Sequence, residues 1–433
     1  MPNIQSMSTL ACRKMAAAFI LANEIAMIYS DIQQCEKKLA ATLFQYETLR
    51  RDTPLVGQFI DQEGAQHPHK GIYGMSAWCF LVGHLSDLFP NNPLRENVIT
   101  RQRQCCQQLA EWVNMGDNSA PEQENEFAFE AKYVIAKICA IHDALRLNAD
   151  FTDIANKLSR HLCDNRITKN GWGFTIDALS AHPVATCIVL RSLVGDQSAR
   201  VHIISALVFL ESAASELTGY LKLFVLNTII LCSGQLHTDG RRSALESARI
   251  TIKELIQSSS SLPLHPTSTI NVDYYDKSKI RYYRLQPDLI ALETLALMSG
   301  DYRVYLKAFP GSTLFEHLRK TVDHFHSTFQ DTYGGKLSFS TCLDIYRCLQ
   351  VLNCHSEKNI PKLFAQIRTA LAFSLGPSED VVQLGVGTTA LVVGFISSQG
   401  WLTGAGGGSL VAQAGKIIVR LFNLRKKRET TRL

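Results

Sequence analysis

The stretch NGWGFTIDALSAHPVATCIVLRSL, residues 170–193, has two halves that decide the fold. The first half places two glycines around a tryptophan, and the second half is a run of small and apolar residues. Comparable stretches stand at 70–85, 282–297 and 333–352, each a glycine- or aromatic-rich lead-in followed by an apolar run. Repeated apolar helices bury their faces only against their neighbours, so the repeat predicts stacked helical pairs.

The rest of the chain has the same helical character. Apolar residues recur near every 3.6 positions between loop-like stretches, and we expect no clear alternating strands. Residues 222–231 (KLFVLNTIIL) are rich in strand-forming residues, but their neighbours favour a helix. The sequence therefore predicts an all-α fold. The expected loops lie at 61–70, 114–125, 164–171, 257–268 and 331–335.

The motifs NGWGF at 170–174 and YGGKLSFSTCLDIYRCLQVL at 333–352 resemble inner-helix repeats of the α/α toroid. Terpene cyclases and protein prenyltransferase β subunits share that fold. The resemblance covers residues 50–375 and implies five or six helical hairpins around a cavity. It concerns the fold and not the activity, because one fold carries many functions.

The catalytic motifs of those two families are missing. The DxDD acid of the cyclases is absent, and the nearest string, Asp273 to Asp276, has the wrong spacing. At the zinc site of the prenyltransferases, Asp288 stands where an Asp is needed, but Ile290 replaces the Cys. We therefore expect no metal, no cofactor, no cyclisation and no prenyl transfer.

The 433 residues divide into three expected parts: N-terminal helices at 1–50, the toroid domain at 51–376 and a Gly-rich apolar segment at 377–433.

The net charge of +5 arises at the C-terminus, since residues 1–400 hold 37 basic and 38 acidic side chains. The charge balance of residues 1–400 does not indicate a large nucleic-acid surface on the body, and the basic residues form a C-terminal tail. Twelve cysteines without a CxxC motif indicate free thiols in an intracellular compartment. The short apolar run at 15–22 is interrupted by polar residues, which disfavours a signal peptide.

The C-terminal segment predicts contact with a membrane. The 35 residues between Asp380 and Lys416 carry no charge, and 381–402 is long enough to cross the hydrocarbon of a bilayer. Small residues recur at every fourth position, which lets helices approach closely in lipid or in a homo-oligomer. We expect residues 381–424 to meet lipid, either as a hairpin or as one span and an interfacial helix. The alternative is a buried core helix followed by a frayed tail. The expected membrane residues are Gly394, Gly400, Trp401, Gly404, Gly408, Lys416, Arg420, Arg425, Lys426, Lys427 and Arg428.

A second candidate site is DKSKIRYYRLQPD at 276–288, where cationic and tyrosine side chains alternate. Cations contact phosphate, and tyrosine faces stack on bases, so this pattern is typical of a site for a nucleotide or another short anionic ligand. The alternative is a solvated loop whose aromatics cap the next helix. The expected ligand residues are Lys277, Lys279, Arg281, Tyr282, Tyr283 and Arg284.

Other chemistry-bearing residues give weaker indications. His324 and His326 would point to different faces of a helix, which disfavours a shared metal ion. Asp177 and His182 are five positions apart on one expected inner helix, where a satisfied pair is favoured over a cavity-facing one. We find no GxSxG, GxGxxG or GxxxxGK[ST] motif.

Three functional hypotheses follow. The first is a membrane-acting effector, of a kind suited to bacterial or antiviral defence, with a cytoplasmic toroid that senses a ligand or partner. The second is a toroid enzyme for an isoprenoid or phosphorylated substrate. Tyr282, Arg281 and Arg284 would hold the anionic group of the substrate, and Asp177 or Asp288 would act as the acid or base. The third is a soluble interaction scaffold whose C-terminal segment docks a partner protein.

Overall fold

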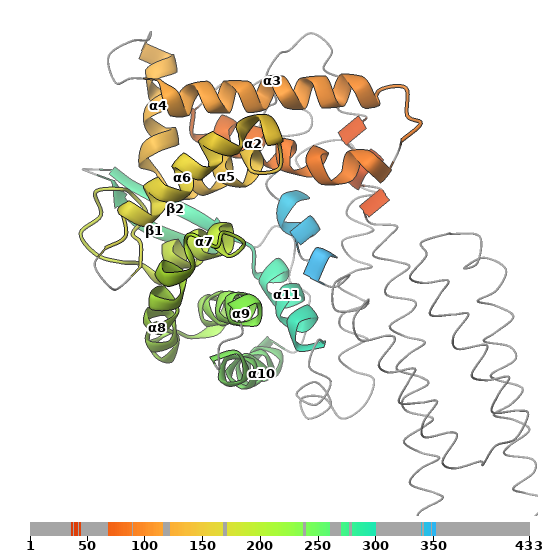
Figure 1. The fold of residues 1–433 in the computed structure, drawn as a ribbon. Helices are drawn as coiled ribbons and strands as arrows, with labels where there is room; N and C mark the ends of the chain where they lie inside the picture. The colour runs from red at the N-terminus through yellow and green to blue at the C-terminus, as the bar shows by residue number, and fades with distance from the viewer. Residues whose placement is uncertain are drawn as a thin grey trace, which may run out of the picture. The chain divides into compact units, whose positions relative to one another are not determined.

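The structure is a computed structural model that divides into two compact units, Ser30–Asn353 and a second unit made of Met1–Tyr29 with Cys354–Leu433. All residues that the structure describes belong to the first unit (Figure 1). The predicted membrane segment and the cluster around His324 and His326 lie outside the described residues. The described residues are 36–37, 39–41, 43–44, 68–88, 90–115, 122–167, 171–236, 240–259, 270–276, 279–299, 339, 342–347 and 349–351.

The described part is mostly helical, which confirms the all-α prediction. The ambiguous run 222–231 lies inside a helix. The expected loops at 114–125 and 164–171 fall where one helix ends and the next has not yet begun or is just beginning, while 257–268 begins at the end of α10 (Gly240–Ser259) and precedes a strand. Two 3-10 turns stand at Ser86–Leu88 and Ala149–Phe151. The helices are α2 (Pro68–Leu85), α3 (Arg95–Asn114), α4 (Glu122–Tyr133), α5 (Ile135–Leu145), α6 (Thr152–Asp164), α7 (Pro183–Leu193), α8 (Arg200–Glu216), α9 (Gly219–Leu236), α10 (Gly240–Ser259) and α11 (Pro287–Ser299).

The helices pack in an inner series and an outer series. The inner series runs α2, α5, α7, α9 and α11, each in contact with the next, while α3, α6, α8 and α10 each pack on the inner helix before them. The helical residues 342–347, called here the 342–347 segment, return to α2, where the Tyr346 ring lies 6.5 Å from that of Phe80. This order is the one that an α/α toroid requires, and the complete toroid stays a prediction.

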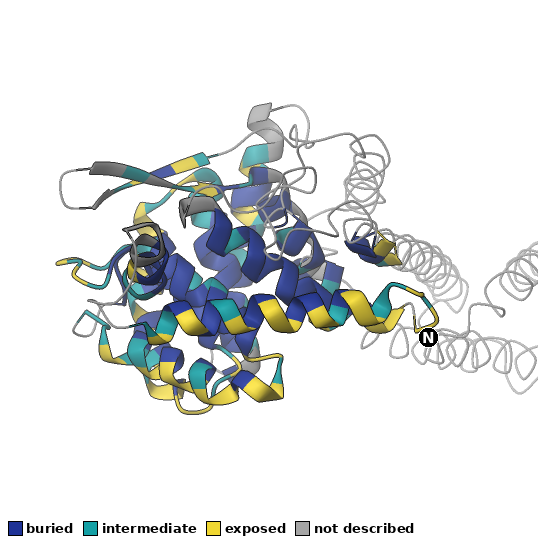
Figure 2. Cartoon of the chain, turned by 90° about the horizontal axis from the view of Figure 1, so that it is seen from above, coloured by how far each residue is buried: buried dark blue, intermediate teal, exposed yellow. Residues whose placement is uncertain are grey.

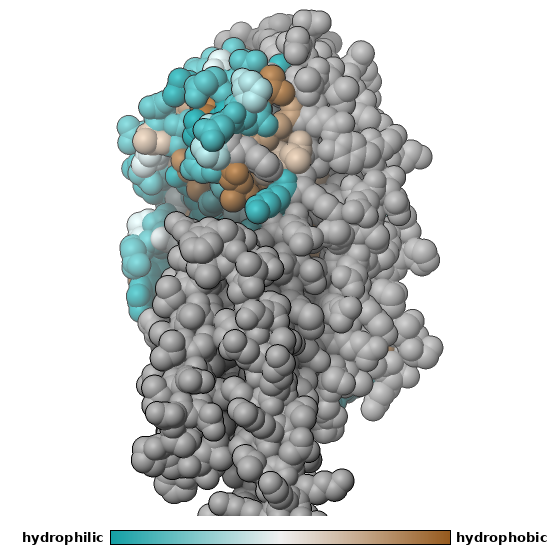
Figure 3. All heavy atoms as spheres, turned by 90° about the vertical axis from the view of Figure 1, so that its right-hand side faces the viewer, coloured by the Kyte–Doolittle hydropathy of each residue, from teal (hydrophilic) through white to brown (hydrophobic). Residues whose placement is uncertain are grey.

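Burial follows this arrangement. Outer helix α6 buries Ala155, Leu158, Ser159 and Leu162, spaced three or four residues apart, and exposes its other side. Inner helices α5 and α7 bury most of their length. Figure 2 shows buried residues in the middle of the described part and exposed residues along the outer faces. On the face that Figure 3 draws, the described surface is mainly hydrophilic with small hydrophobic spots.

The NGWGF stretch fixes the connection from α6 to α7. Trp172 is fully buried, its Nε1 donates to the Leu162 carbonyl at 2.6 Å, and its backbone N–H donates to Thr186 Oγ1. Gly171 has a φ of 107°, and an added Cβ would lie 2.4 Å from Thr186 Oγ1. Only glycine fits there, because L side chains rarely adopt this conformation and no space is left for one.

One expectation about secondary structure is wrong. Residues 270–285 form a β-hairpin, in which β1 (Ile270–Asp276) pairs antiparallel with β2 (Lys279–Leu285). The register places Val272 opposite Tyr283 and Tyr274 opposite Arg281. The Tyr274 ring stacks on Phe174 with the centroids 4.5 Å apart, so the hairpin lies against the NGWGF connection. The tyrosines and β-branched residues of this stretch favour strand, and two adjacent strands satisfy each other's backbone groups.

None of the described helices is both long and apolar enough to cross a membrane. The described residues also contain no group of three or more His, Cys, Asp or Glu side chains arranged to hold a metal ion. The eight cysteines in the described part are free thiols, and most are buried among apolar side chains.

Candidate functional site

A cavity of about 150 Å³ lies among the inner helices, and segments far apart in the sequence form its wall. Helices α2, α5, α7, α9 and α11 contribute to it, together with the end of β2 and the 342–347 segment. Most of the wall is apolar, but six charged side chains also line it: Asp143, Arg191, Arg284, Glu293, Asp344 and Arg347. This combination of apolar walls and a few convergent polar groups is typical of small-molecule sites.

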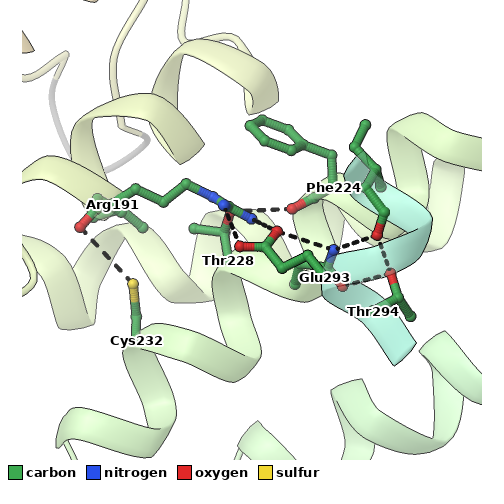
Figure 4. A network of polar contacts seen from close by, with 9 residues as sticks. Arg191, Phe224, Thr228, Cys232, Glu293 and Thr294 are labelled. Atoms are coloured by element: carbon green, nitrogen blue, oxygen red, sulfur yellow. Dashed lines mark hydrogen bonds and ion pairs between the residues drawn. The ribbon is translucent and has the colours of Figure 1, made fainter. Parts of the chain in front are cut away.

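The α7 and α11 side of the cavity holds a closed ion pair (Figure 4). Arg191 donates to both carboxylate oxygens of Glu293 at 2.9 Å, and its Nε donates to Thr228 Oγ1 at 2.8 Å. Its guanidinium also lies 4.6 Å from the centre of the Phe224 ring. Burial alone would lower the pKa of Arg191, but the adjacent Glu293 carboxylate raises it above its usual value. Arg191 is thus charged, and both of its terminal nitrogens are bound to the Glu293 carboxylate.

The α5 side holds a second closed network. Arg347 donates to Asp143 Oδ2 at 2.5 Å, and Ser192 Oγ donates to Asp143 Oδ1 at 2.8 Å. Burial would raise the pKa of Asp143, but His142, Arg347 and Arg146 outweigh it and lower the pKa to about 2. His142 Nδ1 lies 2.8 Å from Ser192 Oγ, yet Ser192 is 1% exposed. A nucleophilic serine must reach its substrate, so this cluster serves the structure.

Asp344 differs from the other acids of the wall. Among the residues that the structure describes, none hydrogen-bonds to its carboxylate. Burial raises the pKa of Asp344 to about 6, although the charges of Arg347 and Arg191 act in the opposite direction. The two arginines do not offset the burial cost, because each is bound to another carboxylate. Asp344 is therefore the wall acid left available to a ligand.

Two tyrosines of the wall are also available. Within the described part of the chain, the hydroxyl groups of Tyr73 and Tyr283 have no hydrogen-bond partner. Burial raises the pKa of both phenols, and the Asp344 charge raises that of Tyr283 further, so both stay protonated and can donate. Burial likewise raises the pKa of the Cys139 thiol, which keeps it protonated and unsuited to nucleophilic attack.

The residues predicted as ligand contacts do not all lie at the cavity. Tyr283 and Arg284 line the cavity, and Arg284 is exposed, so it lies where the cavity meets solvent. Arg281 instead donates to the buried carboxylate of Glu130 at 2.6 Å, and Lys137 reaches the same carboxylate at 2.9 Å. The backbones of Lys279 and Tyr282 belong to β2, while their side chains, and Lys277 as a whole, lie outside the described residues. A ligand site at these six residues stays a prediction.

Five charged residues of the cavity wall stand in no motif of the sequence: Asp143, Arg191, Glu293, Asp344 and Arg347. A signal was present, since each is a charged residue inside an apolar helical run, as in TCIVLRSL and LIALETLAL. Charged side chains at such positions must find partners when the helix is buried.

Asp177 and His182 do not share a helix, so that expectation is wrong. Asp177 stands in the connection before α7 and accepts a hydrogen bond from the Tyr133 hydroxyl at 2.6 Å. His182 is the N-cap of α7, where its Nδ1 accepts from the Val184 backbone N–H at 3.2 Å. Pro183 after it fits only the first turn of a helix, which moves the helix start beyond His182.

Comparison with models of known protein families gave no match, and comparison with curated proteins gave none either.

Proposed function

We propose that this protein is a ligand-responsive membrane effector, in which the helical domain binds a small molecule in its cavity and residues 381–424 engage a membrane. The observation that carries the proposal is the cavity with Asp344, an acid that has no hydrogen-bond partner among the described residues. The membrane part of the proposal rests on the sequence alone, on the 35 uncharged residues and the basic end that follows them.

The chemistry of the wall supports binding over a purely structural role. A carboxyl group removed from water without a partner destabilises the fold, and a neutral side chain of similar size would avoid that cost. Such groups are concentrated at functional sites, where a ligand supplies the missing partner. Arg191 and Arg347 pair with Glu293 and Asp143, so Asp344 alone among these acids fits this description.

Filling the cavity tests the binding half of the proposal. Ala140 lines the cavity from α5, and Ala140→Phe would occupy it without removing any polar group. We expect compounds from a panel of nucleotides, inorganic diphosphate and small amines to raise the Tm of the full chain and of the matched control Ala140→Ser. The same compounds should leave Ala140→Phe unchanged. Equal shifts in all three proteins would show that the cavity is not the binding site.

A charge placed in the apolar segment tests the membrane half. We expect the full chain to remain in the membrane fraction after carbonate washing, and Val393→Arg to be released into the supernatant. An arginine at the centre of a span costs about 2.5–3.5 kcal/mol of insertion free energy. Val393→Leu is the matched control and should behave as the unaltered chain. Equal pelleting of Val393→Arg would contradict insertion through 381–402 and favour a protein-docking segment.

A further inference from the structure

The hydrogen-bonding groups of the cavity wall that can still bind a ligand indicate the chemistry of that ligand. Among the described wall residues, the carboxylate of Asp344 accepts hydrogen bonds, and the hydroxyls of Tyr73 and Tyr283 donate them. Asp344 and Tyr283 are near enough for the carboxylate charge to act on the phenol. A matching ligand therefore carries an N–H donor beside a carbonyl acceptor.

The charge of the cavity favours a neutral ligand head over a cation. A cationic head beside Asp344 would lie near the Arg191 and Arg347 guanidinium groups, which keep a residual effect on Asp344 although Glu293 and Asp143 pair with them. An anionic head would meet Asp344, Glu293 and Asp143. A neutral head with N–H groups satisfies the carboxylate without adding charge.

The remaining wall favours a flat ring. Phe224, Leu289 and Ile290 supply apolar surface beside the two tyrosine rings, and aromatic faces stack on heterocycles. The volume of about 150 Å³ accommodates one ring system. An anionic group attached to that ring would extend toward solvent at the exposed end of the cavity, beside Arg284.

We propose that the cavity binds a heterocycle with a cyclic amide edge of the guanine type, with its ring N–H and exocyclic amine donating to Asp344 and its carbonyl accepting from Tyr283. This assignment rests on the proposed function, that the cavity is a ligand site, and adds the class of ligand. Guanine is the common base whose N–H groups can pair bidentately with a carboxylate.

The test uses the full chain and guanosine, inosine and adenosine 5′-monophosphates as probes, with affinity measured by calorimetry. We expect guanosine monophosphate to bind about 10- to 100-fold more tightly than adenosine monophosphate, with inosine monophosphate between them, since inosine lacks the exocyclic amine. Equal affinities for the three nucleotides would overturn the assignment, and so would an absence of binding at millimolar concentration.

Asp344→Asn provides the matched variant. It keeps the shape of the side chain and replaces an acceptor oxygen by an N–H₂ donor. We expect it to lose at least 10-fold in affinity for guanosine monophosphate and to gain affinity for xanthosine monophosphate, whose second carbonyl accepts from that amide. Unchanged nucleotide preference would overturn the assignment. Circular dichroism would verify that the variant is folded.

The experiments also distinguish a failure of the guanine-type assignment from a failure of the proposed function. If a small amine or inorganic diphosphate raises the Tm, and Ala140→Phe abolishes that shift, the cavity is a ligand site and the guanine-type assignment is wrong. If guanosine monophosphate binds the unaltered chain and Ala140→Phe equally, the site lies elsewhere and both proposals are wrong.

Discussion

The two sides of the cavity solve the problem of buried charge in opposite ways. On the α7 and α11 side, Arg191 and Glu293 form two hydrogen bonds with each other, and Thr228 and Phe224 hold the guanidinium. On the side of the 342–347 segment, Asp344 has no partner among the described residues, and burial raises its pKa to about 6. On the first side the buried charges satisfy each other, and they contribute to stability. On the second side we expect the carboxyl group of Asp344 to obtain hydrogen-bond donors only from a bound molecule.

Breaking the closed pair should have the largest effect. Arg191→Met leaves Glu293 as a buried carboxylate without its guanidinium, which should lower the free energy of unfolding by about 3–5 kcal/mol. The double variant Arg191→Met/Glu293→Leu removes both charges and should recover most of that loss. Urea denaturation of the two variants measures the difference. A double variant as unstable as the single one would show that Arg191 acts through packing on Phe224 and not through charge.

Replacing Asp344, in contrast, should raise the free energy of unfolding. The pKa of Asp344 is higher in the folded protein, at about 6, than its ordinary value of 3.8, so its ionisation opposes folding. Stability from this group is present below pH 4 and is lost as the pH rises from about 4 to 6. Asp344→Asn should therefore raise the free energy of unfolding by on the order of 2 kcal/mol at pH 7.

Measuring the stability gain of Asp344→Asn at two pH values tests whether the ionisation of Asp344 is its cause. The advantage of Asp344→Asn should shrink to a small part of this value at pH 4, where the carboxyl group is protonated in the folded protein and partly ionised in the unfolded protein. Asp143 does not interfere there, because its pKa of about 2 makes its own contribution fall only as the pH drops from about 4 to 2. A stability gain that is equal at pH 4 and pH 7 would contradict an ionised Asp344. The charged and titratable groups that line the cavity around Asp344 are Tyr73, Cys139, Asp143, Arg191, Tyr283, Arg284, Glu293 and Arg347.

The smallest effect is expected at the hairpin. Arg281→Ala removes a cation that contacts Glu130, while Lys137 remains at 2.9 Å from the same carboxylate. The loss should be about 1–2 kcal/mol of unfolding free energy, below that of Arg191→Met. Hydrogen exchange should show faster opening of β1 and β2 with little change in α5. Uniformly faster exchange would indicate that the hairpin belongs to the core and is not a separately attached element.

The elements of the fold were predictable to different degrees. Helices α2, α7, α9 and α11 follow from apolar runs whose spacing suits a helix, and glycine, proline and polar clusters marked most of their ends. The hairpin was missed because its tyrosines stand between basic residues, which gave the pattern of a ligand-binding loop. Strand pairing depends on a second strand, and a single short stretch carries no information about its partner.

The sequence by itself determined that this protein is helical, because helical periodicity depends on interactions within a few residues. The need for glycine at Gly171 came from the structure, because it depends on a positive φ and on Thr186 close by. Only the tertiary structure decided which charges are paired. Arg191 meets Glu293 across 102 positions, Arg281 meets Glu130 across 151, and Arg347 meets Asp143 across 204. Such pairs form only when segments far apart in the sequence pack side by side. The same packing left Asp344 beside two arginines that other carboxylates already occupy.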